Sequence, residues 1–207
     1  QKANVFYYAS NEESPLRSAI YKIDNKGRKT KLSAREGTNS AIFSKSQKYY
    51  INTFSNISTP PVITINDNTG KVLTTLVDNK TLAQKVAKLN MPTKELFTFT
   101  TRDGVELNGW MMKPANFDAT KKYPVIMHQY SGPGSQQVSD RWNIGSRSDN
   151  GMFEAYMADR GFISVCVDGR GTGGRGAAFE KCTYLNLGVK EARDQVEAAL
   201  YLGSLPY

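Results

Sequence analysis

The sequence is poor in the residues that most often carry metal or nucleophilic chemistry. It has one histidine, His128, and two cysteines, Cys166 and Cys182, among 207 residues. Because no second cysteine pair or histidine cluster accompanies them, the cysteines do not form a zinc-binding pattern, and we predict no metal and no other cofactor. The sequence leaves open whether Cys166 and Cys182 form a disulfide.

Long apolar runs are also missing. No segment approaches the about 20 consecutive apolar residues of a membrane helix, and residues 1–10 lack the charged start and apolar stretch of a signal peptide. We therefore expect no membrane segment in this chain and any targeting segment to lie outside it. The net charge of +8 comes from scattered residues such as Arg17, Lys22 and Lys121, a pattern that solvates a surface rather than binding nucleic acid.

An internal repeat occupies the first third of the chain. Segment 19–28, AIYKIDNKGR, aligns with segment 62–71, VITINDNTGK, at a shift of 43 residues. The same shift places 5–9 on 48–52, so each unit has an aromatic strand, an alternating strand and a turn containing glycine. A period in the low forties built of short strands is typical of β-propeller blades. We predict the last two blades of a propeller in residues 1–91; an ordinary antiparallel sheet with accidental similarity is the alternative.

The pattern changes near residue 90. Residues 81–89 have the apolar spacing of a helix and Pro92 marks a break, so we predict a second domain in residues 92–207. Segments 95–100 and 105–112 then flank Asp103-Gly104, a dipeptide that predicts a tight hairpin turn because both central positions tolerate positive φ. The second domain is thus expected to open with an antiparallel hairpin.

After the hairpin the pattern becomes strand, helix, strand. Residues 123–130 and 162–168 are typical of buried strands, and 151–160 of a helix with Phe153, Tyr156 and Met157 on one side. This order predicts a parallel crossover. A last helix, 191–202, carries a stripe that we expect to pack on the sheet, formed by Ala192, Val196, Ala199 and Leu200.

A glycine-rich segment follows the second buried strand. Residues 168–176, DGRGTGGRG, contain the G-x-G-x-x-G pattern of dinucleotide-binding turns. Neither a helix beginning directly at the glycines nor an acidic residue after a further strand is evident, since Asp194 falls inside the last helix. Nucleotide binding and an RNA-contacting loop are therefore both disfavoured. We expect a tight excursion at the carboxyl edge of the sheet, with Asp168 and Arg170 stabilising the turn.

A second turn, 130–135 or YSGPGS, follows the earlier strand and begins with an aromatic hydroxyl. A tyrosine at a strand end is, taken alone, more often a packing residue than a catalytic one. Its chemistry nevertheless fits a site. A phenol with a pKa near ~10 stays protonated at neutral pH and can donate to an oxygen that becomes negative in a tetrahedral intermediate.

Three ordered segments, 130–138, 168–173 and 187–199, resemble the prolyl oligopeptidase family of serine peptidases, and within it the dipeptidyl peptidases. The resemblance covers roughly residues 95–207 and implies the fold class α/β plus β, with a propeller followed by the first part of an α/β-hydrolase domain. It implies a serine peptidase that cleaves peptides after proline, with alanine second, through an acyl-enzyme. By the same resemblance, Tyr130 matches the tyrosine whose hydroxyl helps to form the oxyanion hole.

The rest of the catalytic machinery is not evident. No serine has the G-x-S-x-G surroundings of a hydrolase nucleophile. The histidine of this fold follows the nucleophile along the chain, so His128, inside a strand before Tyr130, is interpreted as structural. The family's glutamates for a substrate's amino terminus lie in an earlier propeller region. We expect the 207 residues alone to be inactive, and a Trp-Gly-x-Ser-x-Gly segment within ~20 residues after Tyr207.

The resemblance also implies properties of the full-length protein. These are a periplasmic, extracellular or cell-surface location, a peptide substrate and a homo-oligomeric state. The alternative from a different functional class is a non-enzymatic propeller and α/β scaffold that binds peptides or proteins.

Overall fold

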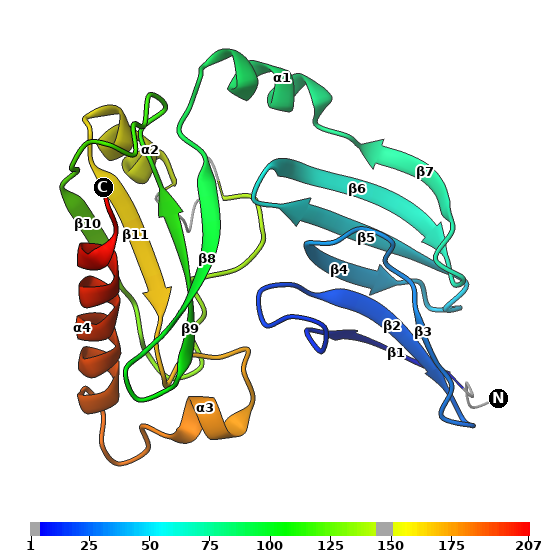
Figure 1. Ribbon diagram of the computed structural model, residues 1–207. Helices are drawn as coiled ribbons and strands as arrows, with labels where there is room; N and C mark the ends of the chain where they lie inside the picture. The colour runs from blue at the N-terminus through cyan, green and yellow to red at the C-terminus, as the bar shows by residue number, and fades with distance from the viewer. Residues whose placement is uncertain (1–4, 144–150) are drawn as a thin grey trace. The chain divides into compact units, whose positions relative to one another are not determined.

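The chain forms two compact units, one built of antiparallel strands and one of mixed strands and helices (Figure 1). The computed structural model describes residues 5–143 and 151–207. The first unit comprises Gln1–Leu89 and Ser139–Trp142, and the second comprises Asn90–Val138 and Asn143–Tyr207. A short stretch after residue 138 therefore belongs to the first unit although its sequence neighbours belong to the second.

The first unit holds two open antiparallel sheets with strands in chain order. The three-stranded sheet consists of β1 (Val5–Ser10), β2 (Ala19–Asp24) and β3 (Lys29–Lys31). The four-stranded sheet consists of β4 (Thr38–Phe43), β5 (Tyr49–Asn56), β6 (Thr59–Asp67) and β7 (Val72–Val77), and helix α1 (Lys80–Lys88) follows it. The core of the first unit is formed by Ile20, Leu32 and Tyr50.

The two copies of the internal repeat form similar hairpins with similar turns. In each copy a carboxylate, of Asp24 or of Asp67, accepts the backbone N–H groups of the residues two and four positions later. Both turns contain a glycine with left-handed backbone, with φ of 77° at Gly27 and 96° at Gly70. The pairing register differs by one residue, because Val5 faces Asp24 whereas Tyr49, and not Lys48, faces Asp67. The repeat predicted from sequence is thus confirmed as two similar hairpins.

The second unit is built on a four-stranded sheet with the order β10-β11-β9-β8. Its strands are β8 (Lys94–Thr100), β9 (Glu106–Met112), β10 (Val125–His128) and β11 (Ile163–Asp168). Its helices are α2 (Gly151–Asp159), α3 (Ala177–Lys181) and α4 (Val189–Ser204). Because β10 and β11 pair in parallel with α2 between them in the chain, the predicted crossover is confirmed. The core consists of Phe99, Leu107, Met111, Ile163, Val165, Val167, Ala198 and Leu202.

The β8–β9 hairpin is confirmed with a different turn from the expected one. The Thr101 N–H donates to the Val105 carbonyl at 2.8 Å, and the Gly104 N–H donates to the Thr101 carbonyl at 2.9 Å. Gly104 has a φ of 81°, whereas Asp103 is not among the residues with positive φ. Only one left-handed residue is therefore needed, as in three-residue hairpin loops that end in a glycine bulge.

Helix α4 packs through a face that combines the core residues Ala198 and Leu202 with three carboxylates, so the predicted packing stripe was wrong. The four residues of that stripe, Ala192, Val196, Ala199 and Leu200, are exposed. The buried side carries three carboxylates, each with a partner, because an unpaired buried charge would be costly. Glu191 accepts the Gly188 N–H, Asp194 pairs with Arg170, and Glu197 pairs with Arg102.

The expected burial of β10 also fails, whereas for α2 only a shared side of the helix was expected. Strand β10 was expected to be buried, but among the described residues it is the edge strand beside β11, and Val125 and His128 are exposed. On α2, Phe153 and Tyr156 are exposed, and the helix packs through a different side. The buried residues of α2 are Gly151, Glu154, Ala155 and Ala158. By contrast, all six residues of β11 are buried, as its apolar sequence predicted.

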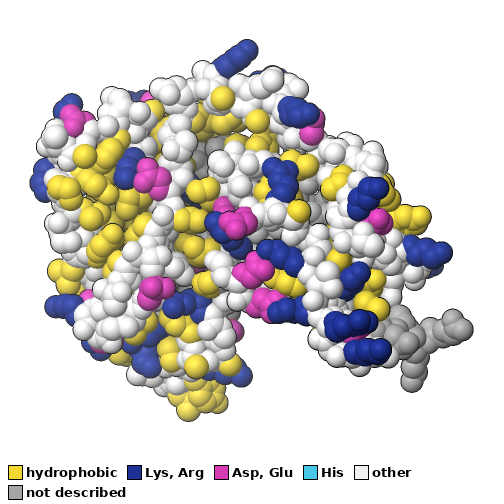
Figure 2. Space-filling view, turned by 45° about the vertical axis from the view of Figure 1, so that its right-hand side comes forward, with side chains coloured by type: hydrophobic (Ala, Val, Ile, Leu, Met, Phe, Trp, Pro, Cys, Tyr) yellow, Lys and Arg dark blue, Asp and Glu magenta, His cyan; other side chains and the backbone are white. Residues whose placement is uncertain are grey.

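Three remaining expectations concern the surface and the cysteines. Figure 2 shows Lys and Arg side chains dispersed among acidic and uncharged ones rather than gathered into one patch on the face shown. Over residues 5–143 and 151–207, no helix is both long enough and apolar enough to cross a membrane. Cys166 and Cys182 are free thiols, and the Cys182 thiol donates to the Phe179 carbonyl at 3.0 Å.

Candidate functional site

Two loops meet at the carboxyl edge of the parallel strands β10 and β11. His128 pairs with Cys166, so Tyr130 and Asp168 each lie two residues beyond this pair. Residues 129–138 are here named the tyrosine loop, and residues 169–176 the glycine loop. The carboxyl edge of parallel strands is where α/β sheets place their sites, so the tyrosine loop and the glycine loop are the first candidates.

Asp168 connects the two loops. Its side chain is buried, and its carboxylate accepts the backbone N–H of Gln137 at 3.0 Å and of Val138 at 2.8 Å. Burial raises the pKa of Asp168, and the two backbone donors oppose that rise. Asp168 therefore stabilises the tyrosine loop, which corrects the prediction that it stabilises its own turn.

The glycine loop approaches the tyrosine loop backbone to backbone. The Gly134 N–H donates to the Gly171 carbonyl at 3.3 Å, and the Gly173 N–H donates to the Ser135 carbonyl at 2.8 Å. A Cβ atom on Gly173 would lie 2.9 Å from the Gly134 carbonyl oxygen. Glycine at this position is what permits the close approach.

Arg170 points toward α4 and the hairpin turn. Its guanidinium lies 2.6 Å from the Asp194 carboxylate and 3.0 Å from the Asp103 carboxylate. The hydrogen bonds and charge of Asp194 raise the pKa of Arg170, which stays charged. Arg170 was expected to stabilise its own turn. Its side chain instead joins the glycine loop to Asp194 of α4 and to Asp103 of the hairpin turn.

The glycine loop does not offer the groups that a dinucleotide needs. A short helix, α3, does begin directly after Gly176, although no helix was evident there in the sequence. The N–H groups of Gly171 and Gly173 are nevertheless already used, donating to the carbonyls of Phe179 and Ser135. Asp194, the acidic residue at a suitable separation, is completely buried against Arg170.

Tyr130 lies on the surface of the tyrosine loop, with its ring beside Gly132, where an added Cβ would be 3.3 Å from the ring and the hydroxyl oxygen. Its side chain is 62% exposed. Within the described ranges its hydroxyl has no hydrogen-bond partner, while its carbonyl accepts the Ser135 hydroxyl at 3.2 Å. His128, the last residue of β10, is also exposed. The phenol is therefore available to a ligand, and the protein holds Tyr130 through its backbone.

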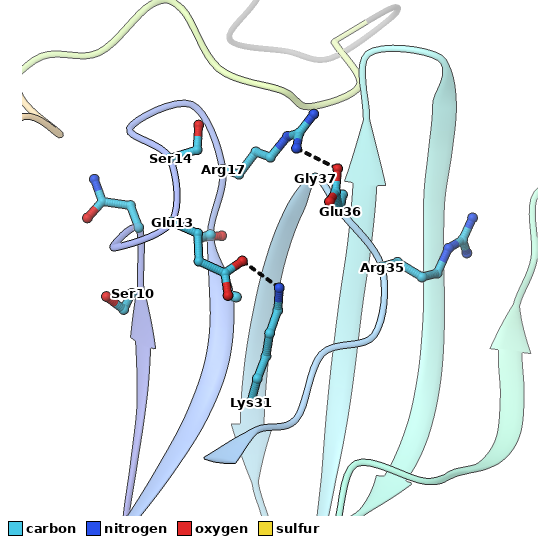
Figure 3. A pocket seen from close by; sticks show the side chains of 11 residues that line it. Ser10, Glu13, Ser14, Arg17, Lys31, Arg35, Glu36 and Gly37 are labelled. Atoms are coloured by element: carbon cyan, nitrogen blue, oxygen red, sulfur yellow. Dashed lines mark hydrogen bonds and ion pairs between the residues drawn. The ribbon is translucent and has the colours of Figure 1, made fainter. Parts of the chain in front are cut away.

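A separate polar pocket of about 130 Å³ lies in the first unit (Figure 3). Glu13 and Lys31 face each other across it at 2.5 Å, and Arg17 lies 2.6 Å from Glu36. Arg17 also lies 2.9 Å from the carboxylate of Asp140, in the short stretch after residue 138. Four of the charges that line this pocket are thus paired within the first unit, while the Arg35 guanidinium lies 3.9 Å from the centre of the Phe54 ring. Sequence reasoning missed the pocket because its partners are far apart in the chain.

Two family models match parts of the chain. The Dipeptidyl peptidase IV N-terminal region matches residues 1–61, and the prolyl oligopeptidase family matches residues 150–207. The chain is 35% identical over 212 residues to a probable dipeptidyl-aminopeptidase B of Sclerotinia sclerotiorum, covering 100% of this chain and 22% of that protein. It is 39% identical over 202 residues to one of Chaetomium globosum, covering 95% of this chain and 21% of that protein.

Solved structures show the same similarity across both units. The chain matches dipeptidyl peptidase 4 of Porphyromonas gingivalis with a TM-score of 0.93 and 48% identity, covering 100% of this chain and 29% of that one. It matches a putative dipeptidyl aminopeptidase IV of Bacteroides ovatus with a TM-score of 0.81 and 33% identity, over 98% of this chain and 28% of that one. The chain thus spans about a fifth of the length of the curated relatives and less than a third of these structures.

Proposed function

We propose that the chain is part of a serine-type dipeptidyl peptidase of the prolyl oligopeptidase family, because both family models and the relatives and solved structures that it matches are of this kind. The full-length protein would release dipeptides from the amino terminus of peptides after proline, and second after alanine, through an acyl-enzyme. The names of the relatives support the release of dipeptides. Cleavage after proline, and second after alanine, is supported by the resemblance of the tyrosine loop to the prolyl oligopeptidase family.

The observation that carries the proposal is the exposed phenol of Tyr130 at the carboxyl edge of the parallel strands. When a serine attacks a peptide carbonyl, negative charge develops on the carbonyl oxygen, and a donor already in place stabilises it. A neutral phenol donates one such hydrogen bond without losing its own proton. We assign this oxyanion-hole role to Tyr130.

The 207 residues alone are proposed to be inactive. Their one histidine, His128, ends β10 and precedes Tyr130, so it does not have the position of the base in this fold. The nucleophile, its acid and its base would come from other parts of the full-length protein. Tyr130 and the scaffold of the first hydrolase strands would come from this chain.

The test compares the full-length protein with the 207-residue chain. The full-length protein should hydrolyse a Gly-Pro anilide and react covalently with a fluorophosphonate, whereas the shorter chain should do neither. Absence of both activities from the folded full-length protein, together with a gene that encodes no serine elbow after Tyr207, would favour the non-enzymatic scaffold. Fluorophosphonate labelling of the 207-residue chain would contradict the assignment of the nucleophile to another part.

Two properties of the whole protein stay predictions of the family resemblance. One is export to the periplasm, cell surface or exterior, which fractionation of the source cells would test. The other is assembly into a homo-oligomer, which light scattering of the full-length protein would test.

A further inference from the structure

The glycine loop holds the tyrosine loop at three points, through the Asp168 carboxylate that precedes it, the Gly171 carbonyl and the Gly173 N–H. We propose that Asp168 and Gly173 are positioning residues that fix the backbone of the tyrosine loop and thereby place the Tyr130 hydroxyl for the oxyanion. This inference rests on the proposed function. It adds a role for the glycine-rich sequence, which nucleotide binding does not explain.

The first step of the argument is that the Tyr130 side chain lies against its own loop, since a Cβ atom on Gly132 would be 3.3 Å from the ring and from the hydroxyl oxygen. The side chain is 62% exposed, and across residues 5–143 and 151–207 its hydroxyl has no hydrogen-bond partner. The position of the phenol therefore follows from the position of its backbone. Any group that fixes the backbone of the tyrosine loop also fixes where the hydroxyl can reach.

The second step is a short path from the glycine loop to the Tyr130 backbone, and it runs through Ser135. The Ser135 carbonyl accepts the Gly173 N–H at 2.8 Å. The Ser135 hydroxyl lies 2.6 Å from the Gly132 carbonyl and 3.2 Å from the Tyr130 carbonyl. One residue thus receives the bond from the glycine loop and directs its side chain back to the start of the tyrosine loop.

The third step concerns the chemistry of Asp168. An ionised carboxylate only accepts hydrogen bonds, so it suits a position that faces two backbone N–H groups. The Gln137 N–H lies 3.1 Å and 3.0 Å from the two carboxylate oxygens. An asparagine here would turn an NH₂ donor toward a backbone donor. Asp168→Asn therefore loosens this anchor while keeping the size of the side chain.

The fourth step concerns Gly173. The substitution Gly173→Ala tests the contact between the two loops without changing a charge. The φ of Gly173 lies outside the left-handed region, so an alanine meets no backbone penalty there. The added Cβ would lie 2.9 Å from the Gly134 carbonyl oxygen and would push the two loops apart. Gly203 in α4 is the matched control, because its φ is also ordinary and nothing lies within 4 Å of an added Cβ.

The expected effect follows from the sensitivity of catalysis to geometry. Misplacing a catalytic group by roughly 1 Å costs on the order of 10²-fold in rate, and complete loss of an oxyanion donor costs about 10²- to 10³-fold. We therefore expect Asp168→Asn and Gly173→Ala to lower kcat by about 10- to 100-fold. KM should change little, because the donor acts in the transition state.

The experiment is a double-mutant cycle in the full-length protein with a Gly-Pro anilide as substrate. Asp168→Asn and Gly173→Ala are each measured alone and combined with Tyr130→Phe. If Asp168 and Gly173 act by placing the Tyr130 hydroxyl, their substitutions should lower kcat little further in the Tyr130→Phe background, where that hydroxyl is absent. Gly203→Ala and Glu197→Gln are the controls; Glu197 is a buried carboxylate that also accepts a backbone N–H, from Arg102 at 3.0 Å.

The outcomes separate this inference from the proposed function. If the wild-type protein has no peptidase activity, the proposed function fails. If Tyr130→Phe is as active as wild type, the oxyanion role of Tyr130 fails, and the positioning inference fails with it. If Tyr130→Phe is impaired but Asp168→Asn and Gly173→Ala lower kcat equally with and without the Tyr130 hydroxyl, the positioning inference fails. Wild-type kcat in both folded variants would overturn it as well.

Hydrogen exchange tests the anchor without relying on activity. In the full-length protein the backbone N–H groups of Gln137 and Val138 should exchange faster in Asp168→Asn than in wild type, and at the wild-type rate in Gly203→Ala. Unchanged exchange in folded Asp168→Asn would contradict the anchoring role. If Asp168→Asn does not fold, Gly173→Ala carries the same kinetic test.

Discussion

The guanidinium of Arg170 lies 2.6 Å from the carboxylate of Asp194, whose side chain is completely buried on the inner face of α4. The same carboxylate accepts the backbone N–H of Arg170 at 2.7 Å. One aspartate thus joins the start of the glycine loop to the longest helix of the second unit. The buried face of α4 thus combines paired carboxylates with the core residues Ala198 and Leu202, and it differs from the predicted apolar stripe.

Removal of Asp194 should destabilise the protein strongly. Breaking a buried ion pair by deleting one partner costs about 3–5 kcal/mol, because the other charge stays behind without its partner. We expect Asp194→Ala to lose roughly this much in urea unfolding. Lys80→Ala is the control, since Lys80 and Asp78 form an exposed pair and its loss should not change the midpoint measurably. Equal midpoints for wild type and Asp194→Ala would contradict the role of this pair.

The pair of Glu197 and Arg102 should make stability depend on pH in the acid range. Hydrogen bonds from the Arg102 side chain and backbone lower the pKa of Glu197 below its ordinary value of 4.5. The unfolded chain then binds a proton at higher pH than the folded one, so the contribution of Glu197 is fully present above 4.5 and is lost as the pH falls through its folded pKa.

Thermal unfolding of wild type and Glu197→Gln across this range measures that contribution. The wild type should melt at a higher temperature at neutral pH, and the difference between the two proteins should shrink as the pH falls below 4.5. A difference that stays constant down to strongly acid pH would show that Glu197 does not titrate with a lowered pKa.

The two equivalent turns of the repeat should respond differently to the same substitution. Gly27 and Gly70 both have left-handed φ, so an alanine costs about 1–2 kcal/mol at either position. A Cβ on Gly27 would have open space, whereas one on Gly70 would lie 2.5 Å from the Leu32 carbonyl oxygen. Gly70→Ala should therefore lower the unfolding midpoint more than Gly27→Ala does. The reverse order in chemical unfolding would contradict the packing of the second turn.

Local signals in the sequence were enough for much of the fold. The apolar run of β11 predicted a fully buried strand, and the Asp-Asn-x-Gly turns showed the repeat before any contact was known. These features depend on neighbouring residues, whose spacing a sequence displays directly. They also placed Tyr130 and Asp168 at the same edge of the sheet.

The burial of α4 and the partner of Asp168 were not predictable in the same way. Asp168 bonds to residues about thirty positions earlier, and Glu197 bonds to Arg102, 95 positions away. A hydrophobic pattern assigns charged residues to the solvent side, so it selected the wrong face of the helix. Only the fold brings each carboxylate to its donor, and this pairing offsets the cost of burying the charge.

The central claim, that Tyr130 supplies a hydrogen bond to the oxyanion, is tested most directly by the kcat of full-length Tyr130→Phe for a Gly-Pro anilide. Tyr156→Phe is the control, because Tyr156 is a similarly exposed tyrosine on α2. We predict a loss of about 10²- to 10³-fold for Tyr130→Phe, with an unchanged melting temperature and wild-type kcat for the control. A Tyr130→Phe enzyme as fast as wild type would contradict the claim.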